Sequence, residues 1–283
     1  MMKNKIKEQL KLMWEAKLTY LFMGFAAVLV LIPVLWMVST SLKVEAETLA
    51  LPPKWIPDNI TFDAYIRLWE EYPFMDYFMN SISVVVVSVI FTVVFSTLAG
   101  YGVTRFKFKG KNAFISFLLI TQMFPSVMLV IPYYKMLSDF NLSNSLFGLM
   151  LVYTSMTLAF CIWLMIGFFK TIPTSLDEAA RIDGCSSFQT FYKIILPLTK
   201  PGIVTTCIYS FIQSWNDYMF AQTLLKDPKV KTVPLGIAEL NGFYKIEWND
   251  LMAASVIASV PVIILFFFLQ KHFVSGLTAG SVK

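Results

Sequence analysis

The chain has 283 residues, of which 57% are hydrophobic and only 14% are charged, and its mean hydropathy is +0.66. A water-soluble domain has about a quarter charged residues, so this composition excludes an ordinary soluble domain and indicates a protein whose solvent is largely lipid. The formal net charge of +5 is small, and the distribution of charge along the chain is more informative than its sum.

Six apolar stretches are each long enough to cross the hydrocarbon core, which takes about 20 residues of α-helix. Without water, the backbone of such a segment must satisfy its own hydrogen bonds, so we expect an all-α membrane protein with six transmembrane helices. Five stretches contain no charged residue, and the fifth along the chain contains Asp217. The predicted spans are 18–38, 82–103, 113–134, 146–169, 202–225 and 251–269.

The first stretch, 18–38, is compatible with either a cleavable signal peptide or a retained span. A signal peptide has an apolar run of about 7–15 residues followed by a small-residue cleavage site. Here 21 uncharged residues run on to VSTS, which is a weak cleavage site, so we expect a retained span.

The 23 Lys and Arg residues are divided unevenly between the two sets of alternating connecting segments. Fifteen of them lie in segments 1–17, 104–112, 170–201 and 270–283. The other eight lie in segments 39–81, 135–145 and 226–250. Because positively charged segments stay in the cytoplasm, we expect both termini to be cytoplasmic.

Several kinds of functional site are excluded by residues that the sequence lacks. A single histidine, His272, excludes a histidine-based metal cluster, and no cysteine pair has zinc-site spacing. No nucleophile and base can be combined within the spans, so we expect no catalytic residue, metal or cofactor. The phosphate-binding pattern G-x-x-x-x-G-K-[ST] is also missing, so any ATP that drives this protein binds to another chain.

Residues 173–201, between the fourth and fifth spans, form the one long stretch where the chain becomes charged. Ser175 and Glu178 have the spacing of a capping box, which predicts the start of a helix. Asp177 and Arg181 are four residues apart, so we expect them to form an ion pair on the exposed side of that helix.

A second helix is predicted to follow directly. Gly184 is placed to end the first helix in a left-handed conformation. Ser186 and Gln189 then have capping-box spacing, and the second helix is expected to end at Pro197.

The first helix is too short to be stable alone and must dock on another surface. One alternative is an interfacial helix that lies on lipid headgroups. Its acidic residues would be repelled by anionic lipid, and a protein groove therefore suits it better. Its apolar side chains also form a poor lipid face, since they are only Leu176, Ala179, Ala180 and Ile182.

The stretch EAARIDGCSSFQTFYKIILPLTKPGI resembles the EAA loop of ABC importer permeases, in which E-A-A is followed by a glycine and later by I-x-L-P. The matching residues are Glu178, Ala179, Ala180, Gly184, Ile194, Leu196 and Pro197. In that family the loop is the coupling helix, which sits in a groove of the ATP-hydrolysing subunit. The resemblance implies a type I importer permease fold and an ATPase contact through Glu178, Ala179, Ala180, Asp183, Gly184, Leu196 and Pro197.

Further stretches resemble the carbohydrate branch of this family, in particular the second membrane subunit of maltose-type transporters. They are PPKWIPDNITFDAYIRLW, SWNDYMFA, KTVPLGIAEL, WNDLMAASVIASVP and QKHFVSGLTAGSVK. The resemblance spans nearly the whole chain, although Cys185 stands where small residues are usual.

The resemblance also implies the partners and the location of the chain. These are a second, homologous permease, two cytoplasmic ATPase subunits, and an extracellular or periplasmic sugar-binding protein. The substrate is a sugar, the surroundings are the lipid of a prokaryotic cell (inner) membrane, and nothing points to nucleic acid. ATP binding is expected to drive alternating access by opposed rocking of the two permeases.

The fifth span carries polar and aromatic side chains that share one face if it is a continuous helix. They are Thr206, Tyr209, Gln213, Asn216, Asp217 and Phe220. Polar groups within a membrane face a protein interface or a watery cavity, so a substrate path is one prediction for Tyr209 through Phe220. The alternative is that Gln213, Asn216 and Asp217 hold this span against the partner permease.

The segment 226–250 lies on the outside, where a binding protein must dock. Asn241, Gly242, Phe243 and Tyr244 combine a flexible pair with two aromatic residues, and we expect them to contact that protein. The alternative is a loop packed on its own spans.

Two other transport functions remain open at this stage. One is an ABC importer for another polar solute, such as a phosphorylated polyol. The other is an ion-coupled secondary transporter that works alone, since a lone intramembrane acid such as Asp217 can couple ion flow. Such transporters more often show several acids or two repeated halves, which this sequence does not.

Overall fold

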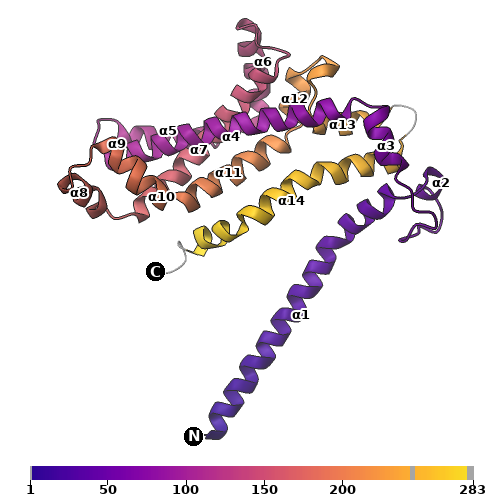
Figure 1. Ribbon diagram of the computed structural model, residues 1–283, viewed down its shortest axis with the longest axis horizontal. Coiled ribbons are helices and arrows are strands. Elements are labelled where there is room, and N and C mark those ends of the chain that lie inside the picture. Colours follow the sequence, from indigo (N-terminus) through magenta and orange to yellow (C-terminus); the bar gives the residue numbers. More distant parts are fainter. Residues whose placement is uncertain (1, 243–245, 279–283) are drawn as a thin grey trace. The chain divides into compact units, whose positions relative to one another are not determined.

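The computed structural model is built from helices, and it describes residues 2–242 and 246–278 (Figure 1). Within those residues the only β-type pairing is an isolated antiparallel bridge between Asn241 and Ile246. The chain divides into two compact units. One unit comprises residues 1–72 and 240–257, and the other comprises residues 73–239 and 258–283.

The first unit holds three helices and the first turns of a fourth. They are α1 (Met2–Ser41), α2 (Glu45–Thr48), α3 (Asp63–Glu70) and the start of α14 (Trp248–Thr278). Arg67 of α3 pairs with Asp250 in the first turn of α14, with its Nε 3.2 Å from Oδ2. This hydrogen bond raises the pKa of Arg67, and the carboxylate also suits the positive end of the helix dipole. The pair therefore fixes the entry into α14.

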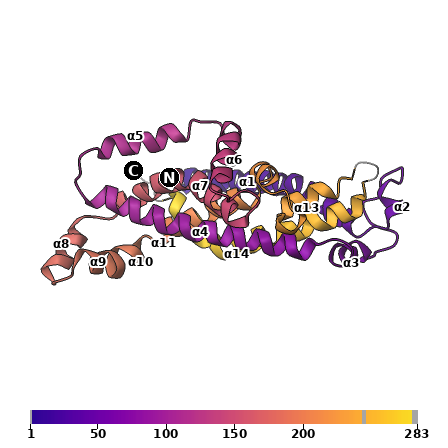
Figure 2. The same ribbon diagram turned by 90° about the horizontal axis from the view of Figure 1, so that it is seen from above.

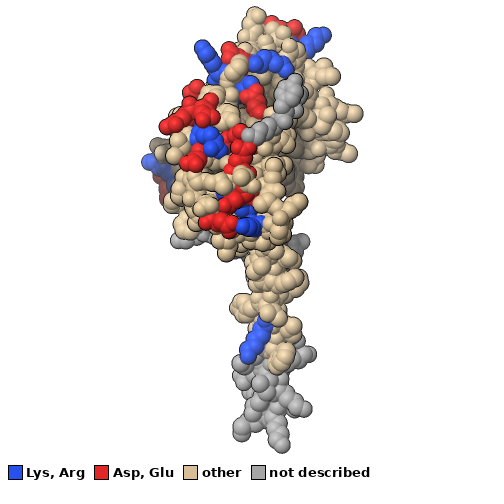
Figure 3. Space-filling model, turned by 90° about the vertical axis from the view of Figure 1, so that its right-hand side faces the viewer, with Lys and Arg blue, Asp and Glu red and all other residues tan. Residues whose placement is uncertain are grey.

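The first unit exposes both acidic and apolar side chains. The acidic residues of α2 and α3 include Glu45, Glu47 and Asp63. The face of the molecule in Figure 3 shows many acidic side chains with some Lys and Arg among them. Residues 16–41 of α1 form an apolar helix of 26 residues, which is long enough to cross a membrane.

The second unit contains the remaining helices. They are α4 (Phe74–Arg105), α5 (Lys111–Thr121), α6 (Val130–Asp139), α7 (Leu146–Thr171), α8 (Ser175–Ile182), α9 (Ser187–Thr190), α10 (Leu196–Leu198), α11 (Lys200–Trp215), α12 (Met219–Leu224), α13 (Val233–Glu239) and the rest of α14. Counted over the described residues, α1, α4, α7 and α14 are long and apolar enough to span a membrane, and the number rises to six if each of two bent helix pairs forms one span.

The third predicted span, 113–134, is not a continuous helix. Helix α5 ends at Thr121, and the chain turns by 99° before the helical segment Ser126–Asp139, whose first turn is a 3₁₀ helix. Pro125 explains this break, because it has no N–H to donate and disfavours helical backbone in the residue before it. Pro125 itself is extended, with ψ at 126°.

The fifth predicted span, 202–225, is also broken. Helix α11 ends at Trp215, and α12 begins at Met219. The chain also bends by 73° between Ser187–Leu198 and α11. The assumption of one straight helix through Asp217 is therefore wrong, and the side chains after Trp215 do not follow a helical period.

Helices α4 and α7 lie side by side along a seam of small residues (Figures 1 and 2). The Thr92 and Thr157 hydroxyls are 2.9 Å apart, and a Cβ on Gly100 would lie only 2.8 Å from Met165 Cβ. Small residues let membrane helices approach closely, and hydroxyls form hydrogen bonds between them. The buried small residues of α4 are Ser81, Ser88, Thr92, Ser96, Thr97 and Gly100.

We predict that Gly100→Val destabilises the protein and that Gly102→Val does not. The first change forces α4 away from Met165, and overpacking of this kind costs about 1–3 kcal/mol. A Cβ on Gly102 meets nothing within 4 Å, so it is a matched control on the same helix. Thermal unfolding in detergent measures the difference, and equal midpoints for the two variants would contradict the close seam.

Candidate functional site

The charged loop between α7 and α11 contains two short helices separated by a glycine. Helix α8 ends at Ile182, and Gly184 has φ of +82°, which confirms the predicted left-handed end. The amide of Gly184 donates to Arg181 at 3.1 Å, and that of Cys185 donates to Ala180 at 2.9 Å. These two bonds form a Schellman motif, so the last carbonyls of α8 are satisfied locally.

The two predicted capping boxes have different outcomes. The Ser186–Gln189 box is confirmed, because both reciprocal hydrogen bonds are present. The box starting at Ser175 is wrong: Ser175 is the first helical residue, and Thr174 precedes the helix without a side-chain cap. Backbone bonds at the Pro173–Thr174 turn, such as the one from Glu178 N to Thr174 O at 3.2 Å, take its place.

A π-helical turn links the second short helix to Pro197. It covers Phe191–Ile195, with the Leu196 amide bonded to the Phe191 carbonyl. The helical run continues to Leu198 and does not stop at Pro197 as expected. Phe191 and Ile195 are buried against Phe169 at the end of α7, so this part of the loop packs into the helical body.

Arg105, the last residue of α4, holds the loop in place. Its Nε lies 3.0 Å from Asp177 Oδ2 in an ion pair, and its Nη2 donates to the Ile172 carbonyl at 2.9 Å. The two charged side chains are 8% and 13% exposed, so the pair is largely buried. The predicted pairing of Asp177 with Arg181 is therefore wrong, because the Asp177 side chain points inward and pairs with Arg105.

Much of the loop surface remains exposed, at the end of the second unit that α4 and α7 reach (Figure 1). Ile182 is 87% exposed and Phe188 is 73% exposed, which is unusual for apolar side chains in a charged loop. Of the residues assigned to ATPase contact, Ala180 is buried and Leu196 is partly buried. The others are exposed, namely Glu178, Ala179, Asp183, Gly184 and Pro197.

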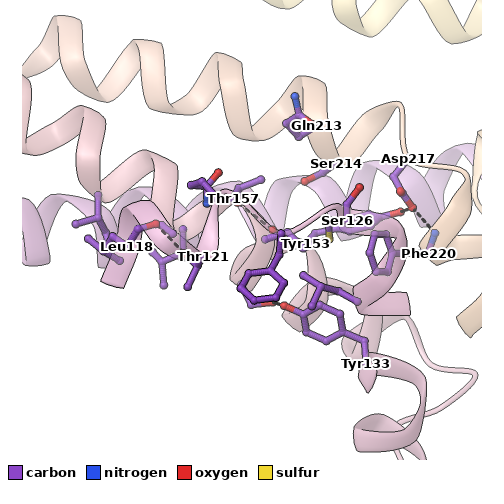
Figure 4. Close-up of a pocket in the computed structure, with 18 of the residues that line it drawn as sticks. Leu118, Thr121, Ser126, Tyr133, Tyr153, Thr157, Gln213, Ser214, Asp217 and Phe220 are labelled. Carbon is purple, nitrogen blue, oxygen red and sulfur yellow. Dashed lines mark hydrogen bonds between the residues drawn. The ribbon is translucent and has the colours of Figure 1, made fainter. Parts of the chain in front are cut away.

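A cavity of about 780 Å³ lies in the second unit among α5, α6, α7, α11 and α12 (Figure 4). Its apolar lining includes Phe114, Phe117 and Phe124. Its polar lining consists of Thr121, Gln122, Ser126, Tyr133, Tyr153, Ser155, Thr157, Tyr209, Gln213, Ser214 and Asp217. Apolar walls with a few polar groups are typical of binding sites for small organic molecules.

Asp217 organises the wall of this cavity that α11 and α12 form. Its Oδ2 accepts hydrogen bonds from the Tyr153 hydroxyl at 2.8 Å and from the amides of Phe220 and Ala221 at 3.1 Å each. The carboxylate thereby caps the first turn of α12 and ties it to α7. This cap allows the helix to break after Trp215 without leaving buried amides unsatisfied.

Four of the five residues predicted for the substrate path line the cavity, namely Tyr209, Gln213, Asp217 and Phe220, whereas Asn216 does not. Tyr133, Tyr153 and Ser155 were not predicted. They come from α6 and α7, and only the three-dimensional fold brings them to this wall. Gln122 and Ser126, which flank the bend at Pro125, also line the cavity, and neither side chain makes a hydrogen bond to described residues.

The segment assigned to the binding protein is only partly described. Asn241 pairs with Ile246, and Gly242 follows it. Phe243 and Tyr244 lie outside the described residues, so their predicted contact stays a prediction.

Comparison with known proteins gives one consistent result. Residues 92–279 match the model of the family described as "Binding-protein-dependent transport system inner membrane component". The chain is 36% identical to the diacetylchitobiose uptake system permease protein DasC of Streptomyces coelicolor, over 89% of this chain and 91% of that protein. It is also 36% identical to the trehalose/maltose transport system permease protein MalG of Thermococcus litoralis, over 91% of this chain and 93% of that protein.

A solved structure extends the similarity to the fold. It is the crystal structure of a bacterial ABC transporter involved in import of the acidic polysaccharide alginate. One of its chains superposes on this one with a TM-score of 0.78 and 26% identity, over 90% of this chain and 95% of that chain.

We predict that reversing either charge of the Arg105–Asp177 pair loosens the loop and that reversing both restores much of its order. Loss of one partner leaves a buried charge and costs about 3 kcal/mol, which corresponds to about a hundredfold more opening. Hydrogen exchange of the amides in 173–186 measures the opening in Arg105→Asp, in Asp177→Arg and in the double variant. Recovery in the double variant is partial, because the bond to Ile172 is not rebuilt. Additive effects of the two reversals would contradict a direct pair.

Proposed function

The chain belongs to the family of binding-protein-dependent transport system inner membrane components, and we propose that it is the permease subunit of an ATP-driven importer for a sugar or oligosaccharide. The observation that carries this function is the family match, which covers both the charged loop and the cavity. The relatives named above are sugar importer permeases of the same length, and the fold is that of a type I importer permease. Permeases of this family are not enzymes, and hydrolysis of ATP belongs to other chains.

In this proposal the exposed surface of the loop docks on an ATPase subunit. Ile182 and Phe188 offer apolar contact area, and Glu178, Asp183 and the Gly184 bend form the polar part of the surface. Closure of two ATPase subunits on ATP displaces the loop. The Arg105–Asp177 pair and the packing of Phe191 and Ile195 pass that displacement to α4 and α7.

The cavity is proposed to be this chain's part of the substrate path. Both α7 and the broken α11–α12 segment line it, so movement of α7 changes its shape. A second, homologous permease supplies the opposite wall, and the two alternate between outward-facing and inward-facing states. The charge distribution supports the proposal that both termini and the loop are cytoplasmic and that the chain crosses a prokaryotic inner membrane several times.

A sugar-binding protein is proposed to dock on the opposite side of the membrane. The segment that contains Asn241, Gly242, Phe243 and Tyr244 lies between α13 and α14 and is on that side in the proposed topology. Its aromatic residues are suited to a protein contact.

We predict that Gly184→Asp abolishes coupling between ATP hydrolysis and uptake, whereas Gly110→Asp leaves it largely intact. Both glycines have positive φ, at +82° and +90°, and at both a Cβ would meet nothing within 4 Å of this chain. The backbone strain, typically about 1 kcal/mol, is therefore matched between them. Only Gly184 lies in the proposed ATPase contact, so only there do added bulk and charge meet a partner.

The measurement compares ATPase activity and sugar uptake of the assembled complexes in proteoliposomes. We expect uptake per ATP hydrolysed to fall at least about tenfold in Gly184→Asp, because the added carboxylate disturbs the proposed contact with the ATPase subunit. Wild-type uptake by assembled Gly184→Asp complexes would rule out this docking surface.

A second prediction concerns the outer segment. Replacement of residues 241–244 by Gly-Ser-Gly-Ser is expected to lower the stimulation of ATPase activity by the binding protein several-fold, because truncation of an interface hot spot, in which tyrosine is enriched, costs about 2 kcal/mol or more. Basal hydrolysis without the binding protein is the internal control and is expected to be unchanged. Full stimulation by the binding protein would reject this contact.

A further inference from the structure

The cavity contains almost no charge. Among its lining residues, all of which the structure describes, Asp217 is the one ionisable carboxylate, and none is Lys, Arg or His. The remaining polar groups are hydroxyls and amides, and the rest of the lining is aromatic or aliphatic. A ligand that carries an anionic group would therefore find a negative charge and no cation to pair with it.

Asp217 uses its two oxygens differently. Oδ2 accepts all three hydrogen bonds that hold α12 and Tyr153 in place, as described above. Oδ1 has no hydrogen-bond partner among the described residues. A carboxylate oxygen is a strong acceptor for hydroxyl groups, because hydrogen bonds to charged acceptors are roughly twice as strong as neutral ones. One oxygen thus maintains the fold, and the other remains available to a ligand.

Two neighbours of Asp217 also present unused polar groups. Ser214 lines the cavity, its side chain is 4% exposed, and its Oγ is buried without a hydrogen-bond partner. The Gln213 amide, also on the lining, makes no side-chain hydrogen bond to described residues. A buried hydroxyl without a partner is unfavourable, and a ligand hydroxyl that approached Ser214 closely would supply that partner. Figure 4 shows Gln213, Ser214 and Asp217 together, at the end of α11 and just beyond it.

Aromatic rings complete the site. Tyr133, Tyr209 and Phe220 belong to the lining, and they offer flat apolar surfaces beside the polar groups. A sugar ring has hydroxyls at its edge and C–H groups on its faces, so it matches a wall that combines free acceptors with aromatic faces. The volume of about 780 Å³ lies within the usual range for sites that enclose a small organic ligand.

We propose that Gln213, Ser214 and Asp217 form a subsite for the hydroxyls of an uncharged saccharide, and that the Asp217 carboxylate excludes anionic saccharides and sugar phosphates from this part of the path. The inference rests on the proposed function, and it narrows the substrate class to neutral sugars. It sets the chain apart from the alginate transporter of similar fold, whose substrate is acidic, and it argues against a phosphorylated polyol. In a cavity with apolar walls, a fixed charge acts strongly on entering ions because little water screens it.

The test measures charge selectivity directly, with reagents that need no knowledge of the natural substrate. Gln213→Cys is introduced into the assembled importer after Cys161, Cys185 and Cys207 have been replaced by Ala. Its rate of reaction is compared for two methanethiosulfonates, one carrying a sulfonate and the other a trimethylammonium group. Free cysteine in solution corrects for the intrinsic reactivity of the reagents.

The quantity compared is the rate of the sulfonate reagent divided by the rate of the cationic reagent. We expect this ratio to be about tenfold lower for Gln213→Cys than for free cysteine. Asp217→Asn is the matched variant: its amide oxygen is an acceptor at the same position, so the charge is lost while an acceptor for the first turn of α12 remains. This variant is expected to remove most of the selectivity. An unchanged ratio in Asp217→Asn, or a cysteine that does not react at all, would overturn the subsite.

Protection by sugars forms the second arm. Maltose, trehalose, cellobiose and diacetylchitobiose are the neutral probes, and trigalacturonate is the acidic one. We expect at least one neutral probe to slow the labelling of Gln213→Cys and trigalacturonate not to do so while Asp217 is present. Protection by the acid, or by none of the neutral probes, contradicts the proposal. Stimulation of ATPase activity by the binding protein is measured on the same complexes, so that loss of the importer function itself is recognised separately.

Discussion

The hydrogen bonds of the Asp217 carboxylate are the interaction on which the rest of the site depends. In a membrane, a helix can break only where another group satisfies the freed backbone amides. Asp217 does this for the first turn of α12 and is tied to α7 through Tyr153. Together with the bend at Pro125, the break turns what would be two straight helices into the walls of a cavity. The same residue therefore permits the cavity and sets its charge.

Helix α7 joins this cavity to the charged loop. Tyr153 and Thr157 near its middle line the cavity, and Phe169 near its end is buried with Phe191 and Ile195 of the loop. Helix α4, which ends at Arg105, packs closely along α7. A loop that was fixed only by its own backbone would hinge freely. We propose that a loop clamped by a buried ion pair and an apolar cluster transmits movement to the cavity.

The sequence predicted some features that depend on neighbouring residues, but it misplaced the capping box at Ser175. Gly184 and the Ser186–Gln189 box have local causes, and both were predicted correctly. Features with distant causes were missed, such as the pairing of Asp177 with Arg105, because no local spacing reveals it. Four residues selected by the helical period of the fifth span lie on the cavity wall, although that period assumed a continuous helix and the chain breaks after Trp215. The wall formed by α6 and α7 had no signal in a single sequence, since hydroxyl residues in apolar helices also serve as packing contacts.

The central claim is that this chain moves a sugar only as part of an ATP-driven complex. The most direct measurement is uptake of the solute retained by its binding protein into proteoliposomes, with the chain reconstituted alone and in the complete complex. The account predicts uptake that requires ATP, the ATPase subunits and the binding protein together, and none by the single chain under a proton or sodium gradient. Uptake by the single chain under such a gradient would contradict it.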